Sequence, residues 1–130
     1  MTVRAEGQFA VKLTPQPTED PSLGRMTIDK QFTGDLEATS RGEMLAAMTE
    51  VKGSAGYVAI ERVTGTLHGR SGSFVLQHSS SMKRGEPQQS ITVVPDSGTG
   101  DLEGLSGTMR IIITDGKHSY ELDYVVAPAG

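Results

Sequence analysis

The 130-residue sequence contains no cysteine, no tryptophan and no asparagine. Without cysteine the chain cannot form disulfides, zinc sites with thiolate ligands or a thiol nucleophile. This absence also fits a reducing compartment. Because asparagine is missing, tight turns must be made by glycine, aspartate, proline or serine, and glycine is frequent at 16 residues.

Aromatic and basic residues are also scarce. The chain has three phenylalanines and three tyrosines, and its 12 lysines and arginines are outnumbered by 16 aspartates and glutamates, for a net charge of −4. Charges of both signs are mixed along the chain, so there is no basic cluster to contact phosphates. Few aromatic rings are available for base stacking. We therefore expect no nucleic-acid partner.

Long hydrophobic runs are missing too. No apolar stretch approaches the roughly 18 residues that a transmembrane helix requires, and the beginning of the chain lacks the charged and apolar regions of a signal peptide. We expect a soluble, cytoplasmic protein without a membrane partner. A length of 130 residues predicts a single domain, 1–130, that folds without a metal or a disulfide.

Alternation of apolar and polar residues, which is typical of half-buried strands, is the dominant pattern. The segments with strand character are residues 2–13, 26–32, 36–48, 57–67, 73–79, 90–94, 108–114 and 117–126. Residues 44–48 have helical propensity, but the residues before them favour a strand.

Loops are predicted where prolines or polar residues interrupt this pattern. Residues 14–21 contain three prolines, and residues 82–87 are polar and turn-like. The dipeptide Asp115-Gly116 between two apolar runs is a strong hairpin signal, because both positions tolerate positive φ.

A short motif recurs three times, beginning at Gly34, Gly65 and Gly100. Each copy places a leucine two residues after the glycine, which suggests a side chain held inward beside a tight turn. The recurrence fits strand pairs in a closed meander, although a glycine-rich chain can also produce it by coincidence. Closure removes exposed sheet edges. The predicted fold is all-β, a closed antiparallel barrel of about eight strands, similar in form to lipocalins.

Glu61 and His78 are the candidate catalytic residues. Either Glu61 or Arg62 must face the interior of a regular strand, and His78 shares its face with two apolar residues. On adjacent strands Glu61 and His78 can act as an acid and base pair, because burial raises the pKa of a carboxyl and an imidazole can transfer its proton. The alternative is a structural ion pair or a glutamate that faces solvent.

Candidate ligand-binding residues are polar or aromatic residues on the predicted inner faces or at a strand end. They are Tyr57, Phe74, Tyr120, His118 and Asp35. The alternatives are core packing for the aromatic residues and turn stabilisation for the aspartate.

No motif points to a metal or a cofactor. The three histidines have no metal-ligand spacing, and residues 98–100 are not followed by the lysine and helix of a phosphate loop. We therefore expect no metal site and no cofactor.

Three blocks of the sequence, 56–78, 93–107 and 116–124, resemble an uncharacterised family of small bacterial proteins with a domain of unknown function. The resemblance extends from about Ala5 to Val126. It implies an eight-stranded antiparallel barrel similar to that of allene oxide cyclase, with a homodimer as one form of assembly. Allene oxide cyclases bind an unstable fatty-acid epoxide in their barrel, but a fold does not by itself carry a function.

Three functions remain open for such a barrel, which is wide enough to be filled by side chains or to hold one small ligand. The first hypothesis is a binding module for a small apolar or amphipathic molecule, since six methionines and few aromatics favour irregular filling. The second is a cofactor-independent cyclase or isomerase that uses Glu61 and His78. The third is a structural or interaction protein with a filled barrel, whose outer face forms a homo-oligomer. The sequence does not decide whether the protein is an enzyme.

Overall fold

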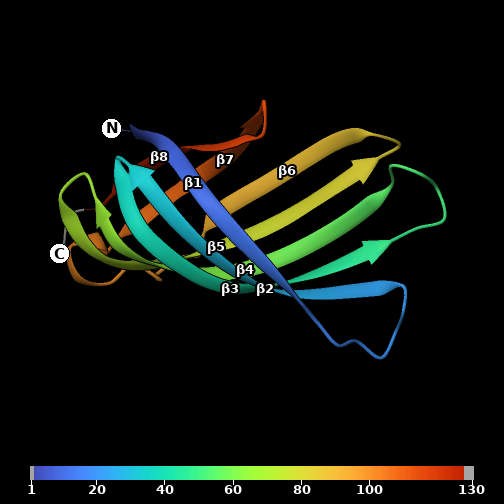
Figure 1. Cartoon of the computed structure of the whole chain (residues 1–130). Helices are drawn as coiled ribbons and strands as arrows, with labels where there is room; N and C mark the ends of the chain where they lie inside the picture. Colours follow the sequence, from blue (N-terminus) through green and yellow to red (C-terminus); the bar gives the residue numbers. More distant parts are fainter. Residues whose placement is uncertain (1, 128–130) are drawn as a thin grey trace.

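The computed structural model describes residues 2–127, and these form one closed antiparallel β-barrel with a single short 3₁₀ helix (Figure 1). In chain order the elements are β1 (Val3–Gln16), β2 (Leu23–Gly34), β3 (Leu36–Met48), β4 (Ala55–Leu67), β5 (Arg70–Lys83), β6 (Glu86–Val93), η1 (Gly100–Leu102), β7 (Leu105–Thr114) and β8 (Lys117–Val126). Each strand pairs with the next one, and β8 pairs with β1. The predicted fold class and strand number are confirmed.

Two predicted loops are shorter than the sequence suggested. The strand β1 continues through Pro15, which lies opposite Met26, so the loop predicted for 14–21 begins only after Gln16. The side of β1 that faces β8 is paired only up to Gln8, and a proline is tolerated on such an unpaired edge. The segment predicted as a turn at 82–87 belongs mostly to β5 and β6.

The segment with helical propensity is a strand. Met44 pairs with Ala59 within β3 and β4, where inward and outward side chains alternate. Local propensity is overridden here because a ladder with neighbours on both sides supplies every backbone hydrogen bond.

Three hairpins use two-residue turns in which both residues have positive φ: His68-Gly69, Arg84-Gly85 and Asp115-Gly116. The turn at Asp115-Gly116 was predicted and is confirmed. The other two place histidine or arginine before the glycine, so they lack the Asn-Gly or Asp-Gly signature by which such turns are recognised.

One end of the barrel, called the closed half below, is tightly packed. The three motif leucines, Leu36, Leu67 and Leu102, are all buried there, which confirms that they point inward. The helix η1 and its flanking loop contact β5 at this end, with Thr99 N–H donating to the Ser73 carbonyl at 2.8 Å. Figure 1 shows the start of β1, the end of β8 and the turns that join β2 to β3 and β4 to β5 at the same end.

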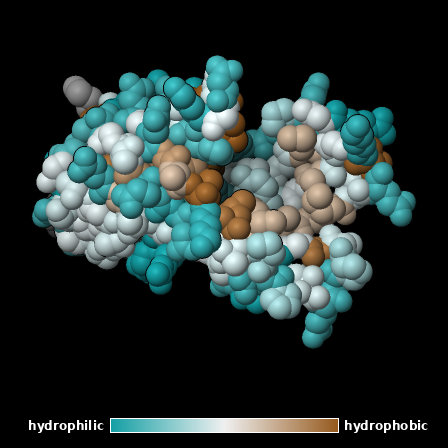
Figure 2. All heavy atoms as spheres, viewed as in Figure 1, coloured by the Kyte–Doolittle hydropathy of each residue, from teal (hydrophilic) through white to brown (hydrophobic). Residues whose placement is uncertain are grey.

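The other end, called the open half, is loosely closed. Strands β6 and β7 pair only at Thr92 and Thr108, and β1 pairs with β8 only over residues 3–8. The barrel wall therefore splays apart, and inward-facing side chains such as Leu13 and Ile113 are 44% and 64% exposed. Figure 2 shows a hollow in this half with apolar residues on its walls.

Candidate ligand cavity

The hollow of the open half is a cavity of about 170 Å³ inside the barrel. Inward-facing side chains from all eight strands line it. Its apolar walls include Val11, Leu13, Ile28, Met44, Ile111 and Ile113. Its polar lining consists of Lys30, Tyr57, His78, Gln89 and His118. An apolar chamber with a few polar groups is the usual composition of a small-molecule site.

A buried polar cluster lies beside this cavity, centred on Glu61 of β4, whose side chain has no solvent exposure. One carboxylate oxygen, Oε1, accepts hydrogen bonds from Lys30 Nζ at 3.1 Å and from His78 Nε2 at 2.9 Å. The other oxygen, Oε2, accepts from Ser40 Oγ at 2.9 Å. The four residues come from the neighbouring strands β2, β3, β4 and β5.

The strand register explains why these side chains meet. Lys30 lies opposite Ser40 in the ladder between β2 and β3, and Gly42 lies opposite Glu61 in the ladder between β3 and β4. Side chains of one parity share a face, so neighbouring inward positions of adjacent strands come within contact distance. Gly42 is needed at this crossing, because a Cβ there would lie 2.7 Å from the Cα of Glu61.

The cluster favours an ionised carboxylate. Burial by itself would raise the pKa of Glu61, but the hydrogen bond from His78 and the positive charge of Lys30 outweigh it. The net result is a pKa for Glu61 below its ordinary value. A carboxylate is an acceptor only, so the proton shared with His78 is carried by Nε2 of the imidazole.

Lys30 closes the inner end of the cavity. Its Nζ lies 5.0 Å from the ring centroid of Phe9 and 5.7 Å from that of Phe32, within the range of cation–π attraction. The ammonium is thus held between a carboxylate and two aromatic faces, at the boundary between the packed core and the cavity.

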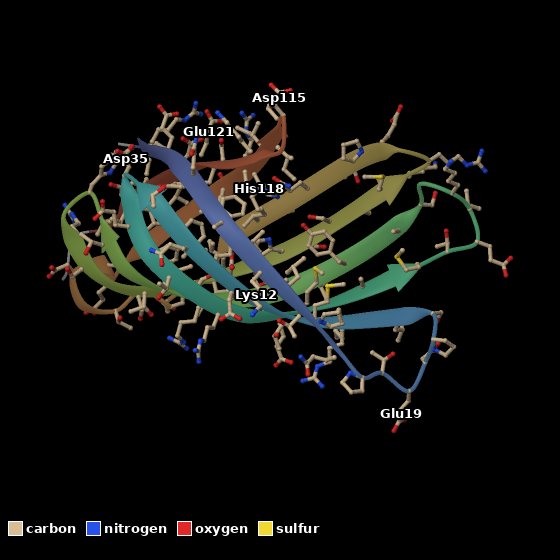
Figure 3. The ribbon with its side chains drawn as sticks, viewed as in Figure 1. Lys12, Glu19, Asp35, Asp115, His118 and Glu121 are labelled. Atoms are coloured by element: carbon tan, nitrogen blue, oxygen red, sulfur yellow. The ribbon has the colours of Figure 1, made fainter. Side chains whose placement is uncertain are left out.

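His118 of β8 lies nearer the mouth, where its ring makes an edge-to-face contact with Phe9 at 5.3 Å. Figure 3 shows His118 over the interior of the barrel and Asp35 at the opposite, closed end. Tyr57 of β4 and His78 of β5 also line the cavity. With His118, they are the sequence-predicted site residues that do so.

Three predicted ligand-binding residues do not line the cavity. Phe74 is 1% exposed within the closed half, where it packs in the core. The hydroxyl of Tyr120 donates to the Thr33 carbonyl at 2.8 Å and accepts the Leu36 N–H at 2.9 Å, so it ties the β2–β3 turn. These residues face inward as predicted, but at the end of the barrel that side chains fill.

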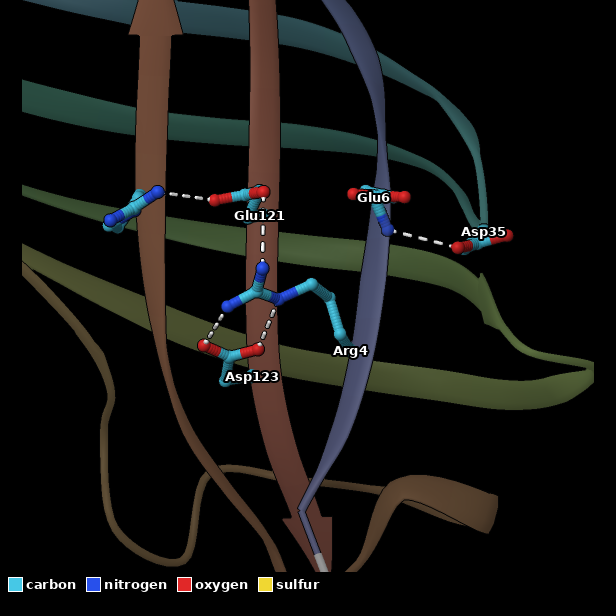
Figure 4. A network of polar contacts seen from close by, with 6 residues as sticks. Arg4, Glu6, Asp35, Glu121 and Asp123 are labelled. Carbon is cyan, nitrogen blue, oxygen red and sulfur yellow. Dashed lines mark hydrogen bonds and ion pairs between the residues drawn. The ribbon is translucent and has the colours of Figure 1, made fainter.

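Asp35 is the third of these residues and stabilises a turn. Its carboxylate accepts the backbone N–H of Glu6 at 3.0 Å, as Figure 4 shows. Figure 4 also shows Arg4 between Asp123 and Glu121 on the outer face of β1 and β8. The hydrogen bond from Arg4 lowers the pKa of Asp123. This outer network joins the first and last strands beside the closed half and lies apart from the cavity.

Two members of the cluster, Lys30 and Ser40, were not identified from the sequence as site residues. Lys30 did carry a signal, because it occupies an inward position between Ile28 and Phe32 in an otherwise apolar alternation. A lysine there requires a buried partner. Ser40 has no comparable signal, since a small hydroxyl residue is ordinary on either face of a strand.

The described part of the chain shows no metal cluster and no membrane-spanning helix. Within residues 2–127, no group of three or more His, Asp or Glu side chains has the arrangement of a metal site. Over the same residues, no helix has both the length and the apolar character needed to cross a membrane.

Comparisons with known proteins place the chain in a family. Residues 5–124 match the model of a family described as a protein of unknown function, DUF3224. A crystal structure of a protein of unknown function from this family, from Shewanella oneidensis MR-1, is similar at 53% sequence identity and a TM-score of 0.95. The match covers 99% of this chain and 100% of that one. The search of curated proteins finds no match. The chain therefore belongs to DUF3224, a family of proteins of unknown function.

Proposed function

We propose that this protein binds one small amphipathic molecule in the cavity of the open half. The observation that carries the proposal is an apolar chamber lined by Lys30 and His78, both of which bond to the buried carboxylate of Glu61 beside it. The apolar part of the ligand contacts residues such as Ile28, Met44 and Ile111. Its polar group reaches Lys30 and His78.

The size of the chamber limits the ligand. An apolar cavity of roughly 150 Å³ is known to take up benzene, and this one measures about 170 Å³. A ligand of about one six-membered ring therefore fits inside, and any longer substituent extends through the mouth. Exposed apolar side chains at the mouth, including Leu13 and Ile113, offer contacts to such a substituent.

The charge of the cluster selects for a neutral polar group. Lys30 carries one positive charge and Glu61 one negative charge, so a neutral His78 leaves the site without net charge. A hydroxyl or carbonyl group would bind without adding an unpaired buried charge, which is costly.

The proposal is tested by ligand-observed NMR with phenol and cyclohexanone as probes and glycerol as a polar control. Wild type is expected to bind both ring compounds and not glycerol. Ala59→Leu should abolish this binding, because Ala59 is buried and lines the cavity, so the larger side chain fills it.

Val58→Leu is the matched control, since the neighbouring side chain is 52% exposed on the outer face. Circular dichroism verifies that both variants fold. If Ala59→Leu does not fold, Ile111→Phe narrows the same cavity from the opposite wall. Absence of ring binding to wild type, or unchanged binding in the filled variant, would refute the proposal.

The homodimer implied by the family resemblance remains a second proposal, favoured by one surface. Leu45 and Val58 face each other on the outer side of β3 and β4, and with Ile60 they are 51–54% exposed. Sedimentation analysis of wild type and Val58→Glu tests this. A dimer that dissociates in the variant supports the proposal, and a monomeric wild type contradicts it.

A further inference from the structure

We propose that the cavity also catalyses proton transfer, with His78 Nδ1 as the general base. The substrate class is a small neutral ketone or aldehyde with an acidic C–H next to its carbonyl group. This inference rests on the proposed ligand-binding function, since the carbonyl compound must occupy the same cavity.

The His78 side chain is oriented by its bond to Glu61. Its Nε2 lies 2.9 Å from an ionised carboxylate, which fixes the proton on Nε2. The side chain is 3% exposed and lines the cavity. Among residues 2–127, the hydrogen bond of the His78 side chain is the one from Nε2 to Glu61, and Nδ1 makes none. In the neutral imidazole this nitrogen carries a lone pair and can accept a proton.

Lys30 supplies positive charge for a developing oxyanion. An ammonium has three N–H donors, and within the described residues one of them is used, toward Glu61 at 3.1 Å. The neighbouring faces of Phe9 and Phe32 cannot accept as strongly as an oxygen. A carbonyl oxygen in the cavity satisfies a second donor, and this interaction strengthens as negative charge builds on that oxygen.

The fixed charges of Glu61 and Lys30 are opposite in sign to the charges that develop on the imidazole and on the substrate oxygen in the transition state. His78 and Lys30 contact the same carboxylate oxygen, so base and oxyanion stabiliser lie on neighbouring sides of Glu61. As the imidazole gains a proton it faces the carboxylate, and as the substrate becomes an enolate its oxygen faces the ammonium. Such preorganised charges lower the barrier without reorganising solvent.

The step is balanced without a co-reactant. The C–H bond next to the carbonyl breaks, and its proton moves to His78 Nδ1. Its electron pair forms the enolate C=C bond, and the carbonyl π electrons move to the oxygen beside Lys30. The imidazolium exchanges its N–H with solvent and then gives a proton to the same carbon, or to the far end of a conjugated system, which restores neutral His78. The first outcome is exchange or inversion at the α-carbon, and the second is an isomerisation.

Glu61 is a positioning residue in this scheme and not the base. Its carboxylate is fully buried and both of its oxygens already accept hydrogen bonds, from Ser40, Lys30 and His78. Burial would raise the pKa of Glu61, but the bonds and charges of His78 and Lys30 lower it overall, which makes it a weaker proton acceptor. The proposal therefore moves the role of base from Glu61 to the imidazole that Glu61 holds.

The test is exchange of the α-protons of cyclohexanone for deuterium, followed by NMR in D₂O. Wild type is expected to exceed the buffer rate, and His78→Gln should lose about 100-fold or more of the catalysed rate, as expected for general-base catalysis. Lys30→Met should also slow exchange. The control is His68→Gln, because His68 bonds Tyr124 in the closed half and does not line the cavity.

A second measurement reads the tautomer of His78 directly by ¹⁵N NMR on labelled protein. We expect the Nε2–H form in wild type and a mixture of tautomers in Glu61→Gln, in which exchange slows while cyclohexanone still binds. A proton on Nδ1 in neutral wild-type His78 would overturn the proposal. So would exchange at the buffer rate while cyclohexanone is bound, and that result would leave the binding function intact. If cyclohexanone and phenol do not bind at all, the binding function fails first.

Discussion

The closed and open halves of the barrel use the same strands but bury their inward side chains to different degrees. Phe32, Leu67 and Leu122 of the closed half have no exposure, whereas Leu13 and Ile113 of the open half are 44% and 64% exposed. The patterns of these residues along their strands are alike, so alternation is not the cause. The difference follows from strand pairing, because two ladders stop before they reach the open half.

This division separates the packed part of the core from the proposed binding cavity. Tight packing and the tied turns concentrate buried area in the closed half, and buried area is the main source of stability. The open half can then keep an unfilled chamber. The cluster of Glu61, Lys30 and His78 lies at the boundary, where Glu61 is buried and Lys30 and His78 line the cavity.

The largest effect is expected at this boundary. Glu61→Ala should lower the free energy of unfolding by about 3–5 kcal/mol, because Lys30 and His78 lose their buried counter-charge. A variant in which Glu61 is replaced by Leu, Lys30 by Met and His78 by Leu should be close to neutral in stability, since apolar residues of similar size fill the same space. Urea denaturation measures both, and a loss below about 1 kcal/mol for Glu61→Ala would contradict this account.

A matched pair of leucines compares the two halves directly. Leu67→Ala removes a fully buried side chain and should cost about 2–5 kcal/mol. Leu13→Ala makes the same chemical change at the mouth, where 44% of the residue is already exposed. Its cost should stay below about 1 kcal/mol, because less apolar area is lost. Equal losses would mean that the open half is as well packed as the closed one.

A pair of tyrosines gives a smaller contrast. Tyr120→Phe should cost about 1–3 kcal/mol, since the buried Leu36 N–H loses its acceptor. Tyr57→Phe should change stability little, because Tyr57 is half-buried and lines the cavity, where water can take the place of a protein partner for its hydroxyl. Thermal unfolding followed by circular dichroism distinguishes these outcomes. A similar change in melting temperature for both variants would argue against the role of Tyr120 as a tie.

The smallest expected effect is a change in the pH dependence of stability. The pKa of Glu61 is lower in the folded protein than in the unfolded chain, so the unfolded chain binds more protons as pH falls. Its contribution is present above roughly pH 4.3, the ordinary pKa of glutamate, and is lost as pH falls through the lower folded value. Glu61→Gln should therefore show a shallower decline on acidification than wild type. Identical slopes would indicate that Glu61 has an ordinary pKa.

Much of the site could be predicted from single strands. Alternation alone puts Glu61 on the same face of its strand as Val63, and His78 on the same face as Phe74 and Leu76. Both faces point inward in the structure. A period of two determines the facing of every residue in a strand once one apolar position is known. The Asp115-Gly116 turn was equally local, because it depends on the backbone preferences of two residues.

Contacts between side chains of different strands could not be predicted from alternation within one strand. Lys30 and Glu61 are 31 positions apart, and their contact depends on the register of two successive ladders. Phe74 and Tyr120 were placed with a ligand because alternation gives the face of a residue but not its height along the barrel. The height is decided by how far each pair of strands is staggered.

The sequence by itself thus determined the strands, their inward faces and the barrel, because these follow from local alternation and turn chemistry. Only the tertiary structure decided that one half is filled and the other hollow, and that a lysine shares the carboxylate of Glu61 with His78. Both depend on the lengths and registers of ladders between distant segments. These are set by the packing of the whole barrel, so no local sequence pattern indicates them.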